Sequence, residues 1–113
     1  MDELNKFFKI LSDETRLQII ILLYFEELCV CEICGVLQLP QPKVSKHLTK
    51  LRDTGLVKDN RNGQYISYRL SIKDETLMNI VKIIVENIDN YPVLKENVKR
   101  IKDKDKFLTG CGC

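Results

Sequence analysis

The sequence lacks the features that mark an exported or membrane-bound protein. Its 113 residues contain no apolar run long enough to span a bilayer. The first residues have neither the basic nor the hydrophobic stretch of a secretion signal. Five cysteines are an odd number, which argues against a framework of disulfides. We therefore expect a cytoplasmic protein without a membrane partner, in which reduced thiols serve metal or redox chemistry.

Sequence signals for catalysis are also missing. His47 is the single histidine, and no cysteine–histidine pair suggests nucleophilic catalysis. No glycine-rich loop is present that would hold phosphate groups. A thioredoxin-like enzyme would need a β-α-β pattern before its cysteines, and this chain has none. The sequence therefore indicates a binding protein rather than an enzyme, with no organic cofactor.

Hydrophobic periodicity predicts one small, mainly helical domain. A chain of 113 residues with 44% hydrophobic content can form one core but not two. Apolar residues at helical spacing predict an amphipathic helix over residues 2–11. Residues 14–24 are apolar nearly all round, which is typical of a buried central helix, and Ser12 or Asp13 would cap it. A weak short helix is predicted over residues 30–37, because Gly35 in its interior costs about 1 kcal/mol relative to alanine.

Residues 41–53 predict the second helix of a helix-turn-helix. Two prolines within residues 39–42 break the chain, and proline suits the first turn of a new helix. Val44, Leu48 and Leu51 recur on one face and would point to the core. The opposite face carries hydroxyl and basic side chains, which suit phosphates and base edges in the DNA major groove. The predicted contacts to double-stranded DNA are Gln41, Lys43, Ser45, Lys46, His47, Thr49, Lys50 and Arg61.

Positive charge is concentrated in this part of the chain. Residues 40–70 hold seven basic and two acidic side chains, although the whole chain has a net charge of only +2. Such an excess alone could be an ordinary solvated surface. Its coincidence with the predicted helix-turn-helix favours a DNA-binding surface.

Residues 56–70 predict a β-hairpin. Asn62-Gly63 is the sequence that a type I′ turn prefers, and apolar and polar residues alternate after it. A hairpin beside a helix-turn-helix makes a winged helix. Arg61, near the tip of this wing, would reach the neighbouring minor groove or the DNA backbone.

A longer helix predicted over residues 74–90 carries more apolar side chains than one small core needs. A surplus apolar face on a terminal helix usually meets a second copy of the chain, so we expect a homodimer. The alternative is that this face completes the core of the monomer. The predicted dimer contacts are Leu4, Phe7, Leu77, Val81, Ile84 and Ile88. The DNA-binding and dimerisation domain would span residues 1–91, and residues 92–113 would form a lysine-rich, partly helical or flexible tail.

Residues 28–34, here called the cysteine box, place Cys29, Cys31 and Cys34 just ahead of the predicted DNA-reading helix. On an ideal helix, Cys31 and Cys34 are about 60° apart and share a face. Cys29 would lie about 160° to 200° away from both. Three sulfurs can therefore bind one ion only if Cys29 precedes the first helical turn, or if that turn unwinds. The box has the features of a switch, because binding would cost local helix.

Three thiolates select a soft ion. Without an obvious fourth ligand, they suit the pyramidal geometry of arsenic(III) or antimony(III), whereas structural zinc takes four ligands. Zinc, cadmium or lead would need Glu32, a water, or an accessory thiol from Cys111 or Cys113. Those two cysteines otherwise belong to a flexible, reactive tail. Two further interpretations stay open: a repressor switched by thiol oxidation, and a structural zinc-binding interaction module that would unfold without zinc.

These motifs together resemble the ArsR/SmtB family of winged-helix metalloregulatory repressors over about residues 4–88. The resemblance is carried by LSDETR at residues 11–16, VSKHL at 44–48, GLV at 55–57 and the Asn62-Gly63 wing. ELCVCEIC, at residues 27–34, is similar to the arsenic and antimony box of arsenical-resistance repressors. The resemblance implies a metal-free dimer that holds operator DNA and releases it when trivalent arsenic binds, so that transcription of resistance genes rises. It also implies that Cys29, Cys31 and Cys34 are the arsenic ligands.

Overall fold

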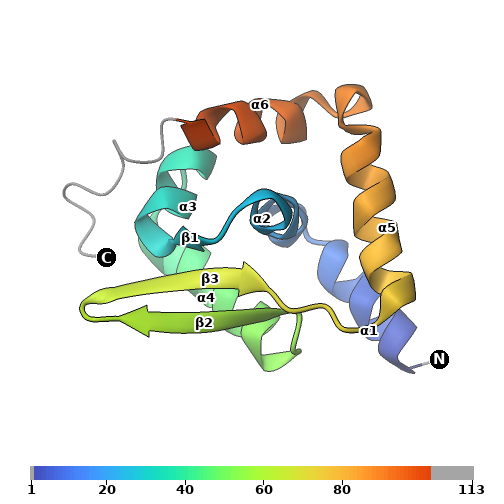
Figure 1. The fold of residues 1–113 in the computed structure, drawn as a ribbon, viewed down its shortest axis with the longest axis horizontal. Coiled ribbons are helices and arrows are strands. Elements are labelled where there is room, and N and C mark those ends of the chain that lie inside the picture. The colour runs from blue at the N-terminus through green and yellow to red at the C-terminus, as the bar shows by residue number, and fades with distance from the viewer. Residues whose placement is uncertain (1, 103–113) are drawn as a thin grey trace.

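The computed structural model describes residues 2–102 and shows a mainly helical fold with a small antiparallel sheet (Figure 1). The helical elements are α1 (Asp2–Leu11), α2 (Glu14–Phe25), α3 (Val30–Leu37), α4 (Gln41–Asp53), α5 (Glu75–Glu86), the 3₁₀ turn η1 (Ile88–Asn90) and α6 (Pro92–Arg100). The strands are β1 (Leu28–Cys29), β2 (Val57–Asn62) and β3 (Tyr65–Leu70), in the order β1-β3-β2. This arrangement confirms the predicted winged helix-turn-helix. None of the helices within this range is both long and apolar enough to cross a bilayer.

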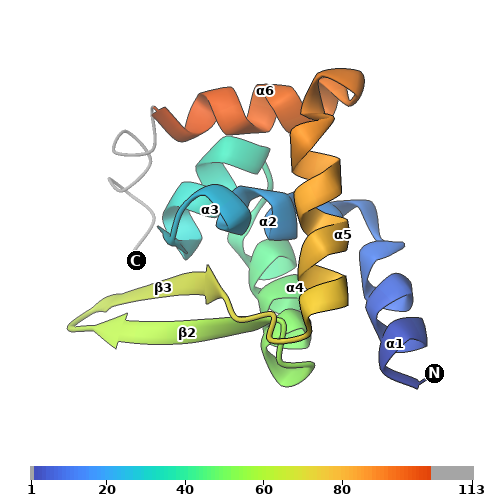
Figure 2. The same ribbon diagram turned by 45° about the vertical axis from the view of Figure 1, so that its right-hand side comes forward.

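Helix α2 lies at the centre of the molecule, and the other helices and the sheet surround it (Figures 1 and 2). The apolar residues from Ile19 to Leu23 are buried on all sides of the helix, as the sequence predicts. Asp13, not Ser12, is the N-cap, and its carboxylate accepts a hydrogen bond of 3.1 Å from the Arg16 N–H. The Arg16 guanidinium donates to the Ile10 carbonyl at 2.9 Å, which fixes the end of α1 against the start of α2.

The turn between α3 and α4 is held by the last residues of α3. Gln38 adopts a left-handed conformation, with φ of 57°. The Leu39 N–H donates to the Cys34 carbonyl at 3.2 Å, and Pro40 then serves as the N-cap of α4. The direction in which α4 begins is therefore set by a backbone bond to a cysteine of the box.

The hairpin turn differs by one residue from the prediction. Asn62 pairs with Tyr65, so the loop consists of Gly63 and Gln64. Gly63 has a φ of +63°, and Gln64 is not among the described residues with positive φ. A positive φ at only the first loop residue is typical of a type II′ turn. The predicted type I′ turn at Asn62-Gly63 was wrong, because Asn62 extends the strand and Gly63 alone supplies the special conformation.

Helix α5 is shorter than the predicted helix over residues 74–90. Asp74 caps its start by accepting hydrogen bonds from the Thr76 and Leu77 N–H groups at 2.9 and 3.3 Å. Asn87 ends it, and its side chain donates to the Ile83 carbonyl at 2.8 Å. Asparagine favours such local side-chain bonds over continued helix, so the apolar pattern overestimated the length.

Helix α6 packs across α2 and α3 (Figure 2). The Asn97 amide, which is buried, donates to the Gln18 side chain at 2.7 Å, and the Arg100 guanidinium donates to the Val36 carbonyl at 3.0 Å. The first part of the predicted tail is therefore helical and belongs to the folded domain. Cys111 and Cys113, the predicted accessory thiols, lie outside the described residues.

Candidate functional site

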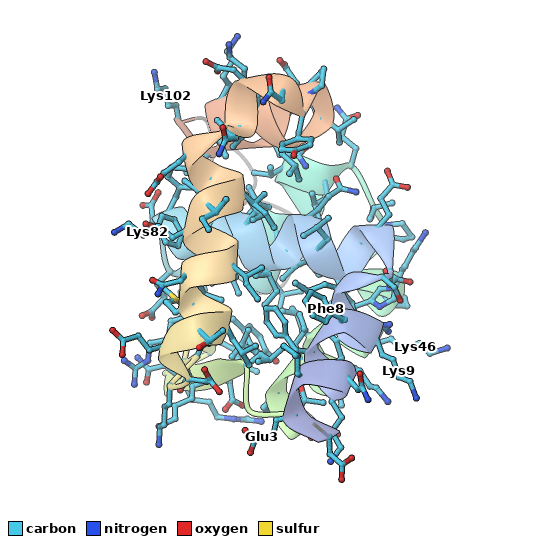
Figure 3. All side chains as sticks on the ribbon, turned by 90° about the vertical axis from the view of Figure 1, so that its right-hand side faces the viewer. Glu3, Phe8, Lys9, Lys46, Lys82 and Lys102 are labelled. Atoms are coloured by element: carbon cyan, nitrogen blue, oxygen red, sulfur yellow. The ribbon has the colours of Figure 1, made fainter. Side chains whose placement is uncertain are left out.

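Helix α4 turns its apolar face to the core and its basic face to solvent. Val44, Leu48 and Leu51 have no exposed surface. Ser45 is half-buried, and the other predicted contact residues except His47 are exposed, namely Gln41, Lys43, Lys46, Thr49, Lys50 and Arg61. Lys46 projects from the edge of the molecule in Figure 3. The amphipathic pattern thus produces the basic, solvent-facing helix that the sequence predicts.

His47 lies differently from the other predicted DNA contacts. Its Nε2 is 3.9 Å from the Asp13 carboxylate, and only 15% of its side chain is exposed. Burial alone would raise the pKa of Asp13, but the Arg16 N–H and the charges of His47 and Arg16 lower it. His47 therefore joins α4 to the start of α2, and this position favours a supporting role over direct DNA contact.

The wing is joined to the last turn of α4. Arg52 Nη1 lies 3.5 Å from the Asp59 carboxylate of β2. Both side chains are partly exposed, so this ion pair contributes little to stability. Arg61 lies further along β2, opposite Ile66 of β3 and close to the turn. Helix α4 and the wing tip thus form two basic elements, which are connected through β2 where it packs against α4.

The cysteine box spans the junction of β1 and α3. Cys29 is the second residue of β1 and the N-cap of α3, whereas Cys31 and Cys34 lie within the helix. The structure thus shows the first of the two predicted arrangements, with Cys29 ahead of the first turn. The Glu32 carboxylate accepts a hydrogen bond of 2.9 Å from the Cys29 N–H and fixes the start of the helix. Cys29, Cys31 and Glu32 are buried, and Cys34 is half-buried.

The environment of the box favours protonated thiols. Burial raises the pKa of Cys29, and the negative charge of Glu32 raises it further. Burial also raises the pKa of Cys34, and charge on Cys29 adds to this effect. Both are free thiols, whereas Cys31 is in the disulfide form. A site with three thiols therefore requires the reduced protein.

The three cysteines are not arranged as a finished metal site. Within residues 2–102, no group of three or more histidine, cysteine or acidic side chains is positioned to hold a metal ion. The helical angle between Cys29 and the Cys31–Cys34 pair does not apply here, because Cys29 lies ahead of α3 in extended conformation. A ligand that needs three sulfurs must therefore rearrange the box, by reduction of Cys31 and by a shift of Cys29 toward the other two cysteines.

Sequence reasoning missed the strand that carries Cys29. β1 has two residues, and they pair with β3 in the register Leu28–Tyr68 and Cys29–Ser67. So short a strand has no periodicity to detect, because its pairing depends on a wing that lies far along the chain. The alternation of apolar and polar residues in β3 was visible in the sequence, but nothing in the sequence indicated that β3 also pairs with β1.

The apolar face of α5 has a buried and an exposed side. Of the predicted dimer contacts, Phe7, Leu77 and Val81 are buried within the single chain. They belong to the core because they lie on the inner side of α1 and α5. Of the other predicted contacts, Leu4, Ile84 and Ile88 are half-buried and pack against the core.

The outer side of α1 and α5 carries large exposed apolar residues. Phe8 is 50% exposed and Ile83 is 59% exposed. Figure 3 shows Phe8 between these two helices, with Lys82 pointing away to one side. The outer face, here defined by Leu4, Phe8, Ile80, Ile83 and Ile84, is thus an apolar surface that the single chain leaves partly uncovered.

Comparison with known proteins gives this geometry a context. The family described as bacterial regulatory protein, arsR family, matches residues 13–59. An arsenical resistance operon repressor of Escherichia coli is 54% identical over 65 residues, which cover 57% of this chain and 56% of the relative. The match thus spans little more than half the length of that repressor.

Longer matches extend to most of the chain. The arsenic resistance transcriptional regulator ArsR2 of Pseudomonas putida is 38% identical over 100 residues, covering 87% of this chain and 85% of the relative. Among solved structures, a homodimeric winged helix-turn-helix DNA-binding domain from Mycobacterium bovis superimposes with a TM-score of 0.66 at 27% identity. That match covers 80% of this chain and 82% of the other.

Proposed function

The chain belongs to the arsR family of bacterial regulatory proteins, and we propose that it is a repressor that responds to arsenic(III) or antimony(III). The members of this family are DNA-binding transcriptional regulators, not enzymes. In the proposed cycle, the metal-free homodimer holds double-stranded operator DNA in the cytoplasm and releases it when Cys29, Cys31 and Cys34 bind the metalloid. The observation that carries the proposal is the position of these cysteines around the start of α3, directly ahead of α4.

The chemistry of the box supports a metalloid over a divalent cation. Arsenous acid, As(OH)₃, condenses with three thiols to give a neutral trithiolate and three waters, with no net release of protons. A divalent cation instead displaces the thiol protons and leaves a negatively charged complex. Such a charge would lie in a buried site beside the carboxylate of Glu32, which disfavours it. Recruiting Glu32 as a fourth ligand would also break its bond to the Cys29 N–H.

The contacts of the cysteine box explain how metalloid binding would change the position of α4, the proposed DNA-reading helix. The three sulfurs can meet only if Cys29 moves toward Cys31 and Cys34, which disturbs the first turn of α3. At the other end of the helix, the Cys34 carbonyl holds the turn that leads into α4. Metalloid binding favours release only to the extent that the metalloid binds the released conformation more tightly than the DNA-bound conformation. The strain of moving Cys29 supplies that difference.

A titration of labelled operator DNA tests the proposal. Fluorescence anisotropy of the chain's own upstream DNA would be followed in a non-thiol reductant while arsenite or cadmium is added, at about pH 6.5 and about pH 8. Arsenite should release the DNA at nearly the same concentration at both pH values. Cadmium should become about a hundredfold weaker for each pH unit of acidification, because at least Cys29 and Cys34 must lose protons.

The same titration distinguishes the alternatives. Absence of release at any arsenite concentration would refute the proposed function. A steep pH dependence with arsenite would mean that the bound species is not the neutral trithiolate. A structural zinc-binding module should lose its helical circular dichroism when a chelator is added, whereas the proposed repressor should keep it.

The exposed lysines of α4 lead to a second prediction. Lys46→Ala and Lys50→Ala should each weaken operator binding, and each should reduce the slope of log affinity against log salt by about 0.9 if one phosphate contact is lost. Arsenite affinity in the absence of DNA should not change. Lys82→Ala removes an exposed lysine from α5, away from α4, and is the matched control. If both α4 variants bind DNA like the parent, α4 is not the reading helix.

A further inference from the structure

The cysteine box is connected to the wing as well as to α4. β3 lies between β1 and β2 in the sheet, and Ser67 of β3 pairs with Cys29 on one side and with Asn60 on the other. The Ser67 hydroxyl is hydrogen-bonded to the carboxylate of Glu27, which lies directly before β1. One residue of the wing is thus fastened to Cys29 through the backbone and to Glu27 through its side chain.

The two residues of β1 face different surroundings. Leu28 and Tyr68 form one cross-strand pair, and both side chains are buried in the core. Side chains alternate along a strand, so Cys29 and Ser67 share the opposite face of the sheet. Tyr68 therefore anchors one end of β3. The part of the wing that extends from Ser67 to the turn, including Arg61, is held by Ile66, which packs against the core, and by the pairing of β3 with β1.

We propose that metalloid uptake breaks the pairing of Cys29 with Ser67, so that the wing loses its DNA-binding position together with α4. This inference rests on the proposed function, because it requires Cys29 to move toward Cys31 and Cys34. Ser67 cannot follow that movement while Tyr68 stays in the core. Breaking β1–β3 is the less costly outcome, since it involves two residue pairs whereas β2 and β3 are joined by six.

The bond between Glu27 and Ser67 then acts as a positioning contact for the DNA-bound state. This hydrogen bond is present while β1 is paired with β3, and it is lost when Cys29 separates from Ser67. A protein that lacks the bond is already closer to the released state, so it should bind arsenite more tightly and DNA more weakly. A merely structural role for Ser67 would not raise the affinity for arsenite.

Ser67→Ala in the full-length reduced protein tests this coupling. Without DNA, its arsenite affinity should rise by about fivefold, the equilibrium factor of one ordinary hydrogen bond, whereas its operator affinity should fall only slightly, because the DNA-competent state stays the major one. Ser67→Thr keeps the hydroxyl and should behave like the parent. Ser71→Ala is the matched control, because Ser71 follows the end of β3 and does not pair with β1.

Hydrogen exchange gives an independent measurement on the parent protein. Arsenite should speed exchange of the backbone amides over residues 66–68 as the pairing with β1 is lost. Unchanged arsenite affinity in Ser67→Ala, or unchanged exchange in β3 while the parent still releases DNA, would overturn the role of the wing. Failure of the parent itself to bind arsenite and release DNA would instead refute the proposed function and, with it, this inference.

Discussion

Replacing Cys31 or Cys34 by serine is expected to abolish arsenite-dependent release of operator DNA and to leave DNA binding by the metal-free protein intact. These residues are the pair on one face of α3, and removal of either leaves no two thiols there to begin a trithiolate. Neither thiol lies on the exposed face of α4. The measurement is operator anisotropy against arsenite concentration, with separate determination of arsenite affinity by calorimetry.

The expected loss is large because release depends on differential affinity. To move a two-state protein from about 99% DNA-competent to about 1%, a ligand must prefer the other state by about 10⁴-fold. A two-thiol complex that does not recruit Cys29 leaves the first turn of α3 undisturbed and has little such preference. Cys29→Ser keeps the Cys31–Cys34 pair and should still bind arsenite, but it should lose release for this same reason. Serine is a preferred N-cap residue, so this variant should keep the start of α3 folded.

The tail variant is the control for this set. Cys111→Ser combined with Cys113→Ser should retain release if those cysteines are only accessory. Full release from the Cys31→Ser and Cys34→Ser variants, with loss only in the tail variant, would move sensing to Cys111 and Cys113. A cysteine variant that no longer binds operator without arsenite would show instead that the thiol supports the DNA-binding fold.

The elements that the sequence predicted are those with strong local signals. Helix α4 could be placed at residues 41–53 because proline marks its start and Val44, Leu48 and Leu51 fix its buried face. The central helix was evident from a run of apolar residues with few polar interruptions. In both cases, local preference and tertiary packing favour the same structure, so the pattern was sufficient.

The features that the sequence did not predict depend on distant parts of the chain. β1 forms because the wing passes beside it, and nothing within Leu28–Cys29 indicates a strand. The turn at Gly63 shifted by one residue because the register of the hairpin decides which residues remain in the loop. The inner and outer sides of α5 could not be separated by sequence, because the same apolar residues suit a core and an interface.

The candidate site was also predicted only in part. The sequence showed the spacing of the three cysteines and predicted that Cys29 would have to precede the helix, unless the first helical turn unwinds. The surroundings of the box could not be predicted. They consist of the Glu32 carboxylate at the start of α3, the burial of Cys29, and the pairing of Cys29 with Ser67, which lies far along the chain.

Ile83→Glu is expected to convert a dimer into a monomer without unfolding the chain. Among residues 2–102, Ile83 is the most exposed large apolar residue, so a carboxylate there stays in solvent in the monomer. In a homodimer across the outer face, the same carboxylate would be buried near its symmetry mate, and burial of unpaired charge is unfavourable. Operator affinity should fall by at least about a hundredfold, because each reading helix would then bind its half-site alone. Sedimentation velocity and operator anisotropy measure the two effects.

The position of the charge makes this a test of the outer face in particular. Lys82→Glu adds negative charge to the adjacent residue of α5, which points away from Phe8 in Figure 3, and should leave the dimer intact. Ile84→Glu is the poorer choice, because Ile84 is half-buried and packs against the core, so its charge would also destabilise the monomer. A folded Ile83→Glu variant that sediments as a dimer and binds operator like the parent would exclude this face. The two reading helices would then have to be paired through a different surface of the chain.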